Sequence, residues 1–344
     1  MSGGTAETNH QDCLNNNPED QLAELFERRL AFVMGKGGVG KTTISAALAI
    51  AAERLGKRVL LAEIGDSDAI GQIFISDTLP EAPLKIADAI WGARVNPKSE
   101  LAAYVNDHIN SSFFANRITR SRLFEYLAAA APGLKEIMSL GRIWRWVLEK
   151  DAGGRAAYDL VIVDAPATGH ALSLLRLPQV LIEMVRFGPI VREVRQLEAL
   201  IKNPDKTWLT QVALAEELPA NEAMQLYQEA QENLGMPLKM VFINAVYPRL
   251  FSPDETAQVG ELLSYCRQNE PAAEGLKLLE AAGQWISRRR RQQPHIDQLA
   301  QEIDSGHMAI PIYFTNYLSI SDIGDIAARL LDAMQPPEKG LNLR

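Results

Sequence analysis

The segment Gly35–Thr43 constrains the fold of this 344-residue chain more than any other feature. It reads Gly-Lys-Gly-Gly-Val-Gly-Lys-Thr-Thr and fits the pattern G-x-x-x-x-G-K-[ST]. The apolar run Leu30–Met34 precedes it, and Thr42–Leu55 follows with apolar residues at helical spacing. Glycines let successive backbone N–H groups point at one anion, and a helix N-terminus adds positive charge. The pattern therefore predicts a strand, a phosphate-binding loop and a helix in immediate succession.

The residue types in this loop predict how it would hold a nucleoside triphosphate and Mg²⁺. Lys41 is expected to reach the β- and γ-phosphates, and the Thr42 hydroxyl is expected to ligate Mg²⁺. The predicted nucleotide contacts within the loop are Gly35, Gly37, Gly38, Val39, Gly40, Lys41, Thr42 and Thr43.

Short apolar runs alternate with helical stretches along the chain, a pattern typical of a parallel α/β sheet. The expected strands are Leu30–Met34, Arg58–Leu61, Leu160–Val163, Trp208–Val212, Met240–Ile243 and Ile310–Tyr313. Because these runs are apolar throughout, we expect helices to cover both faces of the sheet. The predicted fold class is α/β: a mostly parallel, doubly wound sheet flanked by helices and carrying a helical subdomain.

One α/β domain is expected over residues 25–335, since neither a repeat nor a long linker divides the chain. The polar residues 1–24 are expected to form a disordered tail, and 336–344 a second tail. The helical subdomain is expected at about 86–150, without a strand, and at 178–202. Long helices are predicted over Gln179–Ile201, Ala272–Ile303 and Asp322–Met334.

The composition excludes several classes of protein. A formal net charge of −8 argues against nucleic-acid binding through a basic surface. No apolar run approaches the ~18 residues of a membrane span, and the first residues lack the pattern of a secretory signal. The two cysteines, Cys13 and Cys266, argue against a disulfide framework. We therefore expect a cytoplasmic protein without nucleic-acid partners and without stable membrane insertion.

Lys36 directly follows the first glycine, which is unusual in loops of this kind. The complete motif resembles the deviant form of the superclass that contains MinD, ParA, the nitrogenase iron protein and ArsA. In that superclass the early lysine reaches across a dimer interface to the partner's nucleotide. The resemblance implies a homodimer with nucleotide between its subunits, in which Lys36 is catalytic and stabilises the charge that shifts on the γ-phosphate.

A second motif begins where an apolar strand ends in Asp164. A carboxylate at that position can hold Mg²⁺ through water. The segment Asp-Ala-Pro-Ala-Thr-Gly-His-x-Leu-x-x-Leu-x-x-Pro resembles the second switch of the ArsA and Get ATPases, which act in arsenite pumping and tail-anchored-protein targeting. The resemblance, to the bacterial branch, implies that Asp164, Gly169 and His170 respond to nucleotide, with Gly169 as the hinge.

Asn244 follows the apolar strand Leu238–Ile243 and resembles the adenine-contacting asparagine of the same family. A carboxamide offers one donor and one acceptor, which match the N6/N7 edge of adenine. No Asp follows at the spacing of guanine-binding proteins, so ATP is expected in preference to GTP.

The first switch departs from the family pattern. The family carries an Asp after the second strand, where it orients the attacking water. Here Gly65 occupies that position and Asp66 follows one residue later. Our hypothesis is that Asp66 takes the catalytic role through a one-residue slip, with Gly65 and Asp66 forming the switch.

The resemblance implies an ATP-hydrolysing, Mg²⁺-dependent homodimer whose nucleotide state controls dimer closure and a helical surface for an unknown client or partner protein. Two alternatives stay open. A non-hydrolysing, nucleotide-gated interaction module follows if no carboxylate reaches the water. A ParA/MinD-like positioning ATPase would need a membrane helix or a basic DNA-binding patch. The run Arg288–Arg291 is compatible with a solvated face, with ion pairs in a dimer, or with a regulatory or polyanion contact.

Overall fold

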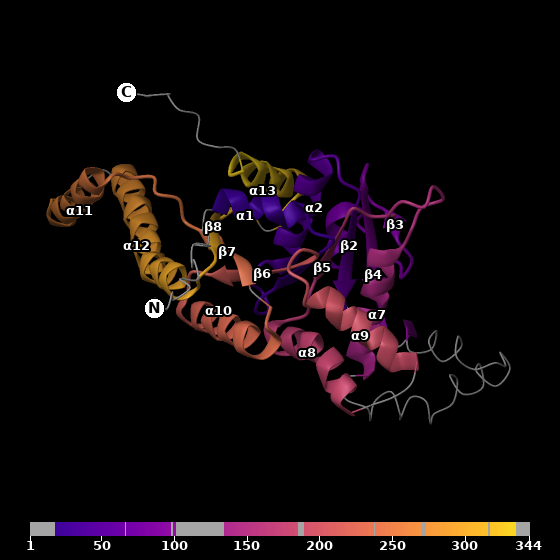
Figure 1. Cartoon of the computed structure of the whole chain (residues 1–344). Helices are drawn as coiled ribbons and strands as arrows, with labels where there is room; N and C mark the ends of the chain where they lie inside the picture. Colours follow the sequence, from indigo (N-terminus) through magenta and orange to yellow (C-terminus); the bar gives the residue numbers. More distant parts are fainter. Residues whose placement is uncertain are drawn as a thin grey trace, which may run out of the picture.

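The computed structural model describes residues 18–65, 67–97, 99–100, 134–184, 189–236, 238–269, 273–315 and 317–334. Within these ranges the strands form one sheet of eight, in the order β3-β4-β2-β5-β1-β6-β7-β8 (Figure 1). All neighbouring strands are parallel except β3, which pairs antiparallel with β4. This arrangement confirms the predicted mostly parallel α/β sheet.

The observed strands overlap the predicted ones. They are β1 (Leu30–Met34), β2 (Val59–Ile64), β3 (Leu84–Lys85), β4 (Ile90–Val95), β5 (Leu160–Asp164), β6 (Thr207–Leu214), β7 (Leu238–Val246) and β8 (Gly306–Pro311). The last strand lies earlier than the predicted Ile310–Tyr313. β8 is an edge strand with alternating burial, so it does not need the continuous apolar run that identifies a central strand.

Helices cover both faces of the sheet, as expected for a doubly wound fold (Figure 1). The first face carries α1 (Pro18–Phe26), α2 (Lys41–Arg54), α3 (Ala69–Phe74) and α13 (Ile320–Asp332). The opposite face carries α7 (Leu134–Leu148), α8 (Thr168–Met184), α9 (Pro189–Ile201), α10 (Glu217–Glu229), the π-helical turn η1 (Ala230–Leu234) and the end of α12 (Ala273–Glu302).

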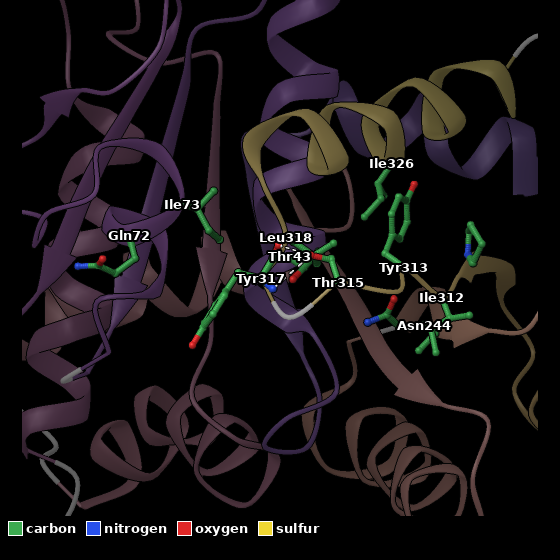
Figure 2. A pocket seen from close by; sticks show the side chains of 12 residues that line it. Thr43, Gln72, Ile73, Asn244, Ile312, Tyr313, Thr315, Tyr317, Leu318 and Ile326 are labelled. Carbon is green, nitrogen blue, oxygen red and sulfur yellow. Dashed lines mark hydrogen bonds between the residues drawn. The ribbon is translucent and has the colours of Figure 1, made fainter.

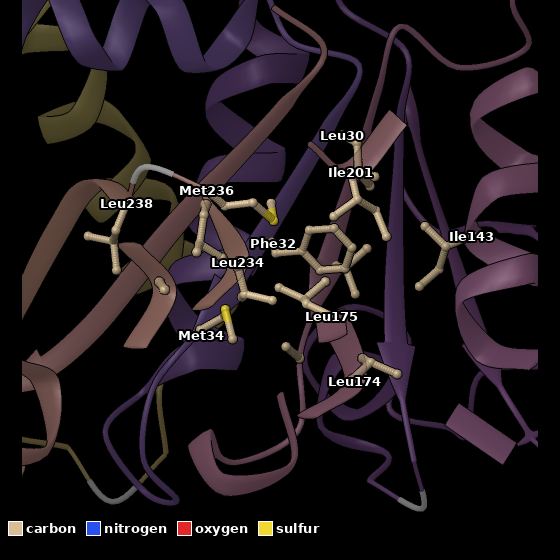
Figure 3. Packing of buried hydrophobic residues seen from close by; sticks show 14 of the residues in the cluster. Leu30, Phe32, Met34, Ile143, Leu174, Leu175, Ile201, Leu234, Met236 and Leu238 are labelled. Carbon is tan, nitrogen blue, oxygen red and sulfur yellow. The ribbon is translucent and has the colours of Figure 1, made fainter. Parts of the chain in front are cut away.

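The alternation of side chains along β1 divides the core into two halves. Leu30, Phe32 and Met34 pack against the helices of the second face, and Figure 3 shows Phe32 among residues of α8 and α9. Ala31 and Val33 point to the other face, against α1, α2 and α13. Burial on both sides explains why the central strands are apolar at every position.

The expectation of an all-helical segment at 86–150 is wrong for its first part. Ile90–Val95 forms β4, which pairs with β2 from Val59 to Ile64. The segment contains Gly92 and Arg94, so its strand conformation follows from pairing with β2 rather than from its own residues. Residues 101–133 lie outside the described residues, while α7 is helical as predicted.

Two further boundaries differ from the predictions. The disordered tail expected at 1–24 is wrong for residues 18–24, because residues 18–26 form α1 and bury Leu22, Leu25 and Phe26, while 1–17 lie outside the described residues. The single helix predicted over Gln179–Ile201 corresponds to α8, which ends at Met184, and α9, which begins at Pro189. Proline is favoured in the first turn of a helix, which explains this start. The tail 336–344 lies outside the described residues.

α11 (Pro253–Gln268) and α12 form a hairpin that projects from the body of the molecule (Figure 1). α12 matches the helix predicted at Ala272–Ile303, and α13 matches the one predicted at Asp322–Met334. Gln292 attaches α12 to the end of β7: its amide donates to the Ala245 carbonyl and accepts from the Tyr247 N–H. The Tyr247 ring also packs edge-on against Trp285 of α12 and against Phe314.

The run Arg288–Arg291 lies on α12. Arg288 donates a hydrogen bond to the Tyr247 hydroxyl and lies over its ring, and Arg291 contacts Ser287. Across the described ranges these arginines form no ion pair, so their role as a contact surface stays open. In the same part of the chain, no helix is both long and apolar enough to cross a bilayer.

The burial of the central strands predicts a large difference between two equivalent leucine truncations. Leu60 of β2 is fully buried, whereas Leu278 of α12 is 74% exposed. We expect Leu60→Ala to lower the free energy of unfolding by about 2–5 kcal/mol, because it leaves a cavity in the core. Leu278→Ala should change it by less than about 0.5 kcal/mol. Denaturant titration measures both values, and equal effects would contradict the described core.

Candidate functional site

The glycine-rich loop between β1 and α2 requires glycine at two positions for steric reasons. Gly35 has φ +149° and Gly40 has φ +98°. A Cβ on Gly35 would lie 2.3 Å from the Val212 carbonyl oxygen, and one on Gly40 would lie 2.2 Å from Asn244 Nδ2. The loop is therefore pressed against β6 and β7, which fixes its path ahead of the α2 N-terminus.

Lys41 and Thr42 begin α2, and their side chains meet groups of the neighbouring segments. Lys41 Nζ donates to the Lys36 carbonyl oxygen at 3.0 Å. Thr42 Oγ1 donates to Asp164 Oδ2 at 2.5 Å. Because β5 lies beside β1 in the sheet, Asp164 at the end of β5 comes next to the loop. The structure thus brings Lys41, Thr42 and Asp164 into one cluster.

Asp164 is a buried carboxylate, one oxygen of which has no partner within the described ranges. Its side chain is 6% exposed, and among the described residues Oδ1 has no hydrogen-bond partner. Burial raises the pKa of Asp164 to about 6, although the Thr42 hydrogen bond and the Lys41 charge oppose this change. Burial likewise lowers the pKa of Lys41, partly offset by Asp164.

A magnesium ion suits this cluster. The hydroxyl of Thr42 and the unsatisfied carboxylate oxygen of Asp164 are hard oxygen ligands of the kind that Mg²⁺ takes together with nucleotide phosphates and water. No group of three His, Cys, Asp or Glu side chains in the described ranges could hold a metal by protein ligands alone. Thr42 and Asp164 would supply part of the coordination shell, and phosphate oxygens and water would supply the rest.

Lys36 contacts a residue of its own chain. Its ammonium forms an ion pair with Glu222 of α10 at 2.5 Å, and the two side chains are 39% and 38% exposed. The pair joins the loop to a helix on the second face of the sheet. In this conformation the Lys36 ammonium is paired with a carboxylate of the same chain.

Asn244 lies at the end of β7 directly beside the loop. Its Nδ2 donates to the Val39 carbonyl oxygen at 2.9 Å. It also lines a cleft of ≈ 620 Å³ together with Thr43, Pro311 and Tyr313. Figure 2 shows Gln72 and Ile73 on the opposite side of this cleft. The lining combines apolar side chains such as Ile73 and Leu318 with hydrogen-bonding side chains such as Gln72 and Asn244, a combination that suits a flat aromatic base with polar edges.

The two predicted switches are described in part. Gly65 follows β2 with φ +112°, a conformation that favours glycine. Asp66 lies outside the described residues, so its role stays a prediction. Asp68 forms an ion pair with Arg94 at 3.2 Å. Gly169 and His170 fall in the first turn of α8, and their roles as switch residues also stay predictions.

Glu63 is a site residue that the sequence analysis did not identify. It is 1% exposed on β2 and lies opposite Asp164 in the register of β2 and β5. Burial raises its pKa, and the Asp164 charge adds to that effect against hydrogen bonds from Ser67 and the Ala69 backbone. The available signal was one acidic residue inside the apolar run Val59–Ile64.

Comparison with known proteins gives consistent matches. A family model described as anion-transporting ATPase matches residues 28–198. ATPase GET3 of Lachancea thermotolerans is 28% identical over 277 residues, covering 69% of this chain and 77% of that protein. A putative arsenical pump-driving ATPase of Aquifex aeolicus is 27% identical over 248 residues, covering 64% and 81%.

A mycobacterial relative gives the assignment. ATPase BagA of Mycobacterium tuberculosis is 30% identical over 238 residues, which cover 68% of this chain and 69% of that protein. The region matched by the family model contains the loop and the neighbouring strands β1 and β5, the latter ending in Asp164. This chain belongs to the ArsA/Get family of P-loop ATPases.

Proposed function

We propose that this chain is a Mg²⁺-dependent ATPase that works as a homodimeric switch. The cluster of Lys41, Thr42 and Asp164 carries the proposal, because it joins a phosphate-binding loop to a metal-binding carboxylate. The cleft beside Asn244 continues from the same loop and would take the adenine base. One nucleotide could thus lie along the edge of the sheet from β7 to β5.

Each group in the cluster has a distinct task in this proposal. The loop backbone, with Gly35, Gly37, Gly38, Val39, Gly40 and Thr43, binds the phosphate oxygens. Lys41 places positive charge at the β- and γ-phosphates. Thr42 and Asp164 hold Mg²⁺, Asp164 through water, and the bound ion would neutralise charge that develops on the phosphates. In this proposal Asp66 orients the attacking water, while Gly65, Gly169 and His170 move with nucleotide state.

Dimerisation would place Lys36 at the partner's nucleotide. That movement requires Lys36 to leave Glu222. Because both side chains are more than a third exposed, the pair contributes only about 0–1 kcal/mol and can be exchanged for a phosphate contact. We infer that nucleotide binding and dimer closure are linked through this exchange, and that the helices of the second face transmit it to a client or partner protein.

The alternatives differ in what they require. A nucleotide-gated module without hydrolysis would keep the ATP-dependent pairing and show no turnover. A ParA/MinD-like positioning ATPase would bind DNA or lipid surfaces, and the acidic net charge does not favour either. ATP turnover and co-sedimentation with DNA or liposomes separate these alternatives.

Removing the Lys36 ammonium should abolish pairing and turnover but not nucleotide binding. We expect Lys36→Ala to reduce ATP turnover by at least about 10²-fold, because a transition-state charge contact is lost. Light scattering with a non-hydrolysable ATP analogue and Mg²⁺ should then show monomers. Lys206→Ala, at an exposed lysine outside the site, is the control. A wild-type protein that stays monomeric under these conditions would rule out the dimeric switch.

Releasing Lys36 from its own subunit should favour closure. Glu222→Gln removes the charge that holds the ammonium, so ATP-dependent dimerisation should strengthen by up to about fivefold. Glu198→Gln on α9 breaks an ion pair with Lys202, just after that helix, and serves as the matched control. Analytical ultracentrifugation across a concentration series measures both constants. Weaker dimerisation of Glu222→Gln would mean that the Lys36–Glu222 ion pair stabilises the dimer, which contradicts the proposed exchange.

The Asp164 charge should lower the stability of the ligand-free protein and be required for Mg²⁺ binding. In Asp164→Asn the amide oxygen can still accept from Thr42, but the buried charge is gone. Without ligands, we expect this variant to have a higher free energy of unfolding than the wild type, by on the order of 1 kcal/mol or more. Its melting temperature should therefore be higher. It should lose the extra stabilisation that Mg²⁺ adds to the ATP complex. Thermal melts with ATP, with and without Mg²⁺, test both parts.

A further inference from the structure

Glu63 and Asp164 bring two buried carboxylates to the same edge of the sheet. The strands β2 and β5 are parallel, and Glu63 pairs with Asp164 in their register. Residues that pair in adjacent strands project to the same face. Both side chains are almost fully buried, with exposures of 1% and 6%. Glu63 therefore lies next to the carboxylate assigned to Mg²⁺.

The two oxygens of Glu63 have different environments. Oε1 accepts a hydrogen bond from the Ala69 N–H at 3.2 Å, at the N-terminus of α3, which follows the first switch. The Ser67 hydroxyl and the Ile70 N–H also stabilise this carboxylate. Oε2 is inaccessible to solvent and has no hydrogen-bond partner among the described residues. Asp164 Oδ1 is in the same condition. One end of Glu63 is thus tied to the switch region while the other is left unsatisfied.

Such an arrangement is unfavourable unless a cation or its water joins it. A buried polar atom without a partner loses its hydration without compensation, and two neighbouring carboxylates also repel each other. Lys41, the cation that acts on Asp164, donates its hydrogen bond to the Lys36 carbonyl and not to Glu63. A role limited to holding the α3 N-terminus would explain Oε1 but not the second oxygen.

We propose that Glu63 positions the divalent cation of this site and couples it to the first switch. Oε2 accepts a hydrogen bond from water in the Mg²⁺ shell, while Oε1 keeps its bond to Ala69. Glu63 thereby supplies a carboxylate near the metal in a chain that has Gly65 where its family carries Asp. This inference rests on the proposed function, since it assumes that the site binds Mg²⁺ with ATP.

Two substitutions separate this role from a purely structural one. Glu63→Gln keeps an amide oxygen that can accept from Ala69 but removes the charge, whereas Glu63→Ala removes both. Glu53→Gln is the matched control, because Glu53 Oε1 accepts from the Ala89 N–H at 2.6 Å on another part of the same sheet face. Mn²⁺ replaces Mg²⁺ as the probe, and its affinity for the complex with a non-hydrolysable ATP analogue is measured by electron paramagnetic resonance.

We expect Glu63→Gln to weaken Mn²⁺ binding by about tenfold, the size of one charge-assisted hydrogen bond, with nucleotide binding in the absence of metal unchanged. Glu53→Gln should match the wild type. The inference is overturned if Glu63→Gln binds Mn²⁺ as tightly as the wild type while Glu63→Ala is destabilised. In that case Glu63 serves only to hold the N-terminus of α3. A wild type that binds no Mn²⁺ with the analogue would overturn the proposed function as well.

Hydrogen exchange on the wild-type protein keeps the inference testable if Glu63→Gln does not fold. Adding Mn²⁺ to the nucleotide complex should slow exchange of the Ala69 and Ile70 amides, because Glu63 is then held at both oxygens. Exchange that does not respond to the metal would contradict the coupling to the first switch, even where Mn²⁺ binds.

Discussion

The parallel pairing of β1, β5 and β2 determines where the charged groups of this protein lie. It places Thr42 against Asp164 and Asp164 beside Glu63, although these residues are far apart in sequence. The two carboxylates are almost fully buried, so water solvates their charges poorly. In this low-dielectric setting each carboxylate is costly alone and attractive to a metal ion. The chemistry of the site thus follows from strand order.

This cluster is less stable than an apolar one would be. Asp164, Glu63 and Ser45 each have a buried oxygen without a partner among the described residues. The fold tolerates these groups because the surrounding core is extensive, with apolar residues packed on both faces of every central strand. A site that is strained without its ligand gains stability when the ligand binds, so ligand binding and stability are linked.

Local patterns predicted the parts of the structure that depend on neighbours in sequence. The glycine-rich loop after an apolar strand, and the apolar strand that ends in Asp164, are patterns that specify their local structure. The observed β1, α2 and β5 lie where these patterns predict them. β4 could not be recognised because Gly92 and Arg94 interrupt its apolar pattern, and only pairing with β2 makes it a strand. Pro189, in the first turn of α9, is a helix-start residue that is present in the sequence, whereas the packing of α9 against α8 depends on the tertiary fold.

Long-range contacts escaped prediction for a different reason. Lys36 and Glu222 are 186 residues apart, so no spacing rule connects them. Glu63 appeared as an isolated acid in a strand, and its meaning depends on the register with Asp164. Asn244 was identified by resemblance alone. The structure adds that its side chain, on β7, donates a hydrogen bond to the Val39 carbonyl and so supports the loop.

The attachment of the α11–α12 hairpin has a mechanical consequence. Gln292 and the ring cluster of Tyr247, Trp285 and Phe314 join α12 to both segments that border the base cleft, the end of β7 and the chain after β8. α12 is 30 residues long, and these contacts are made in its middle part, at Trp285 and Gln292. The position of the hairpin is therefore fixed by the same segments that line the cleft, so a change in one of these segments would alter both.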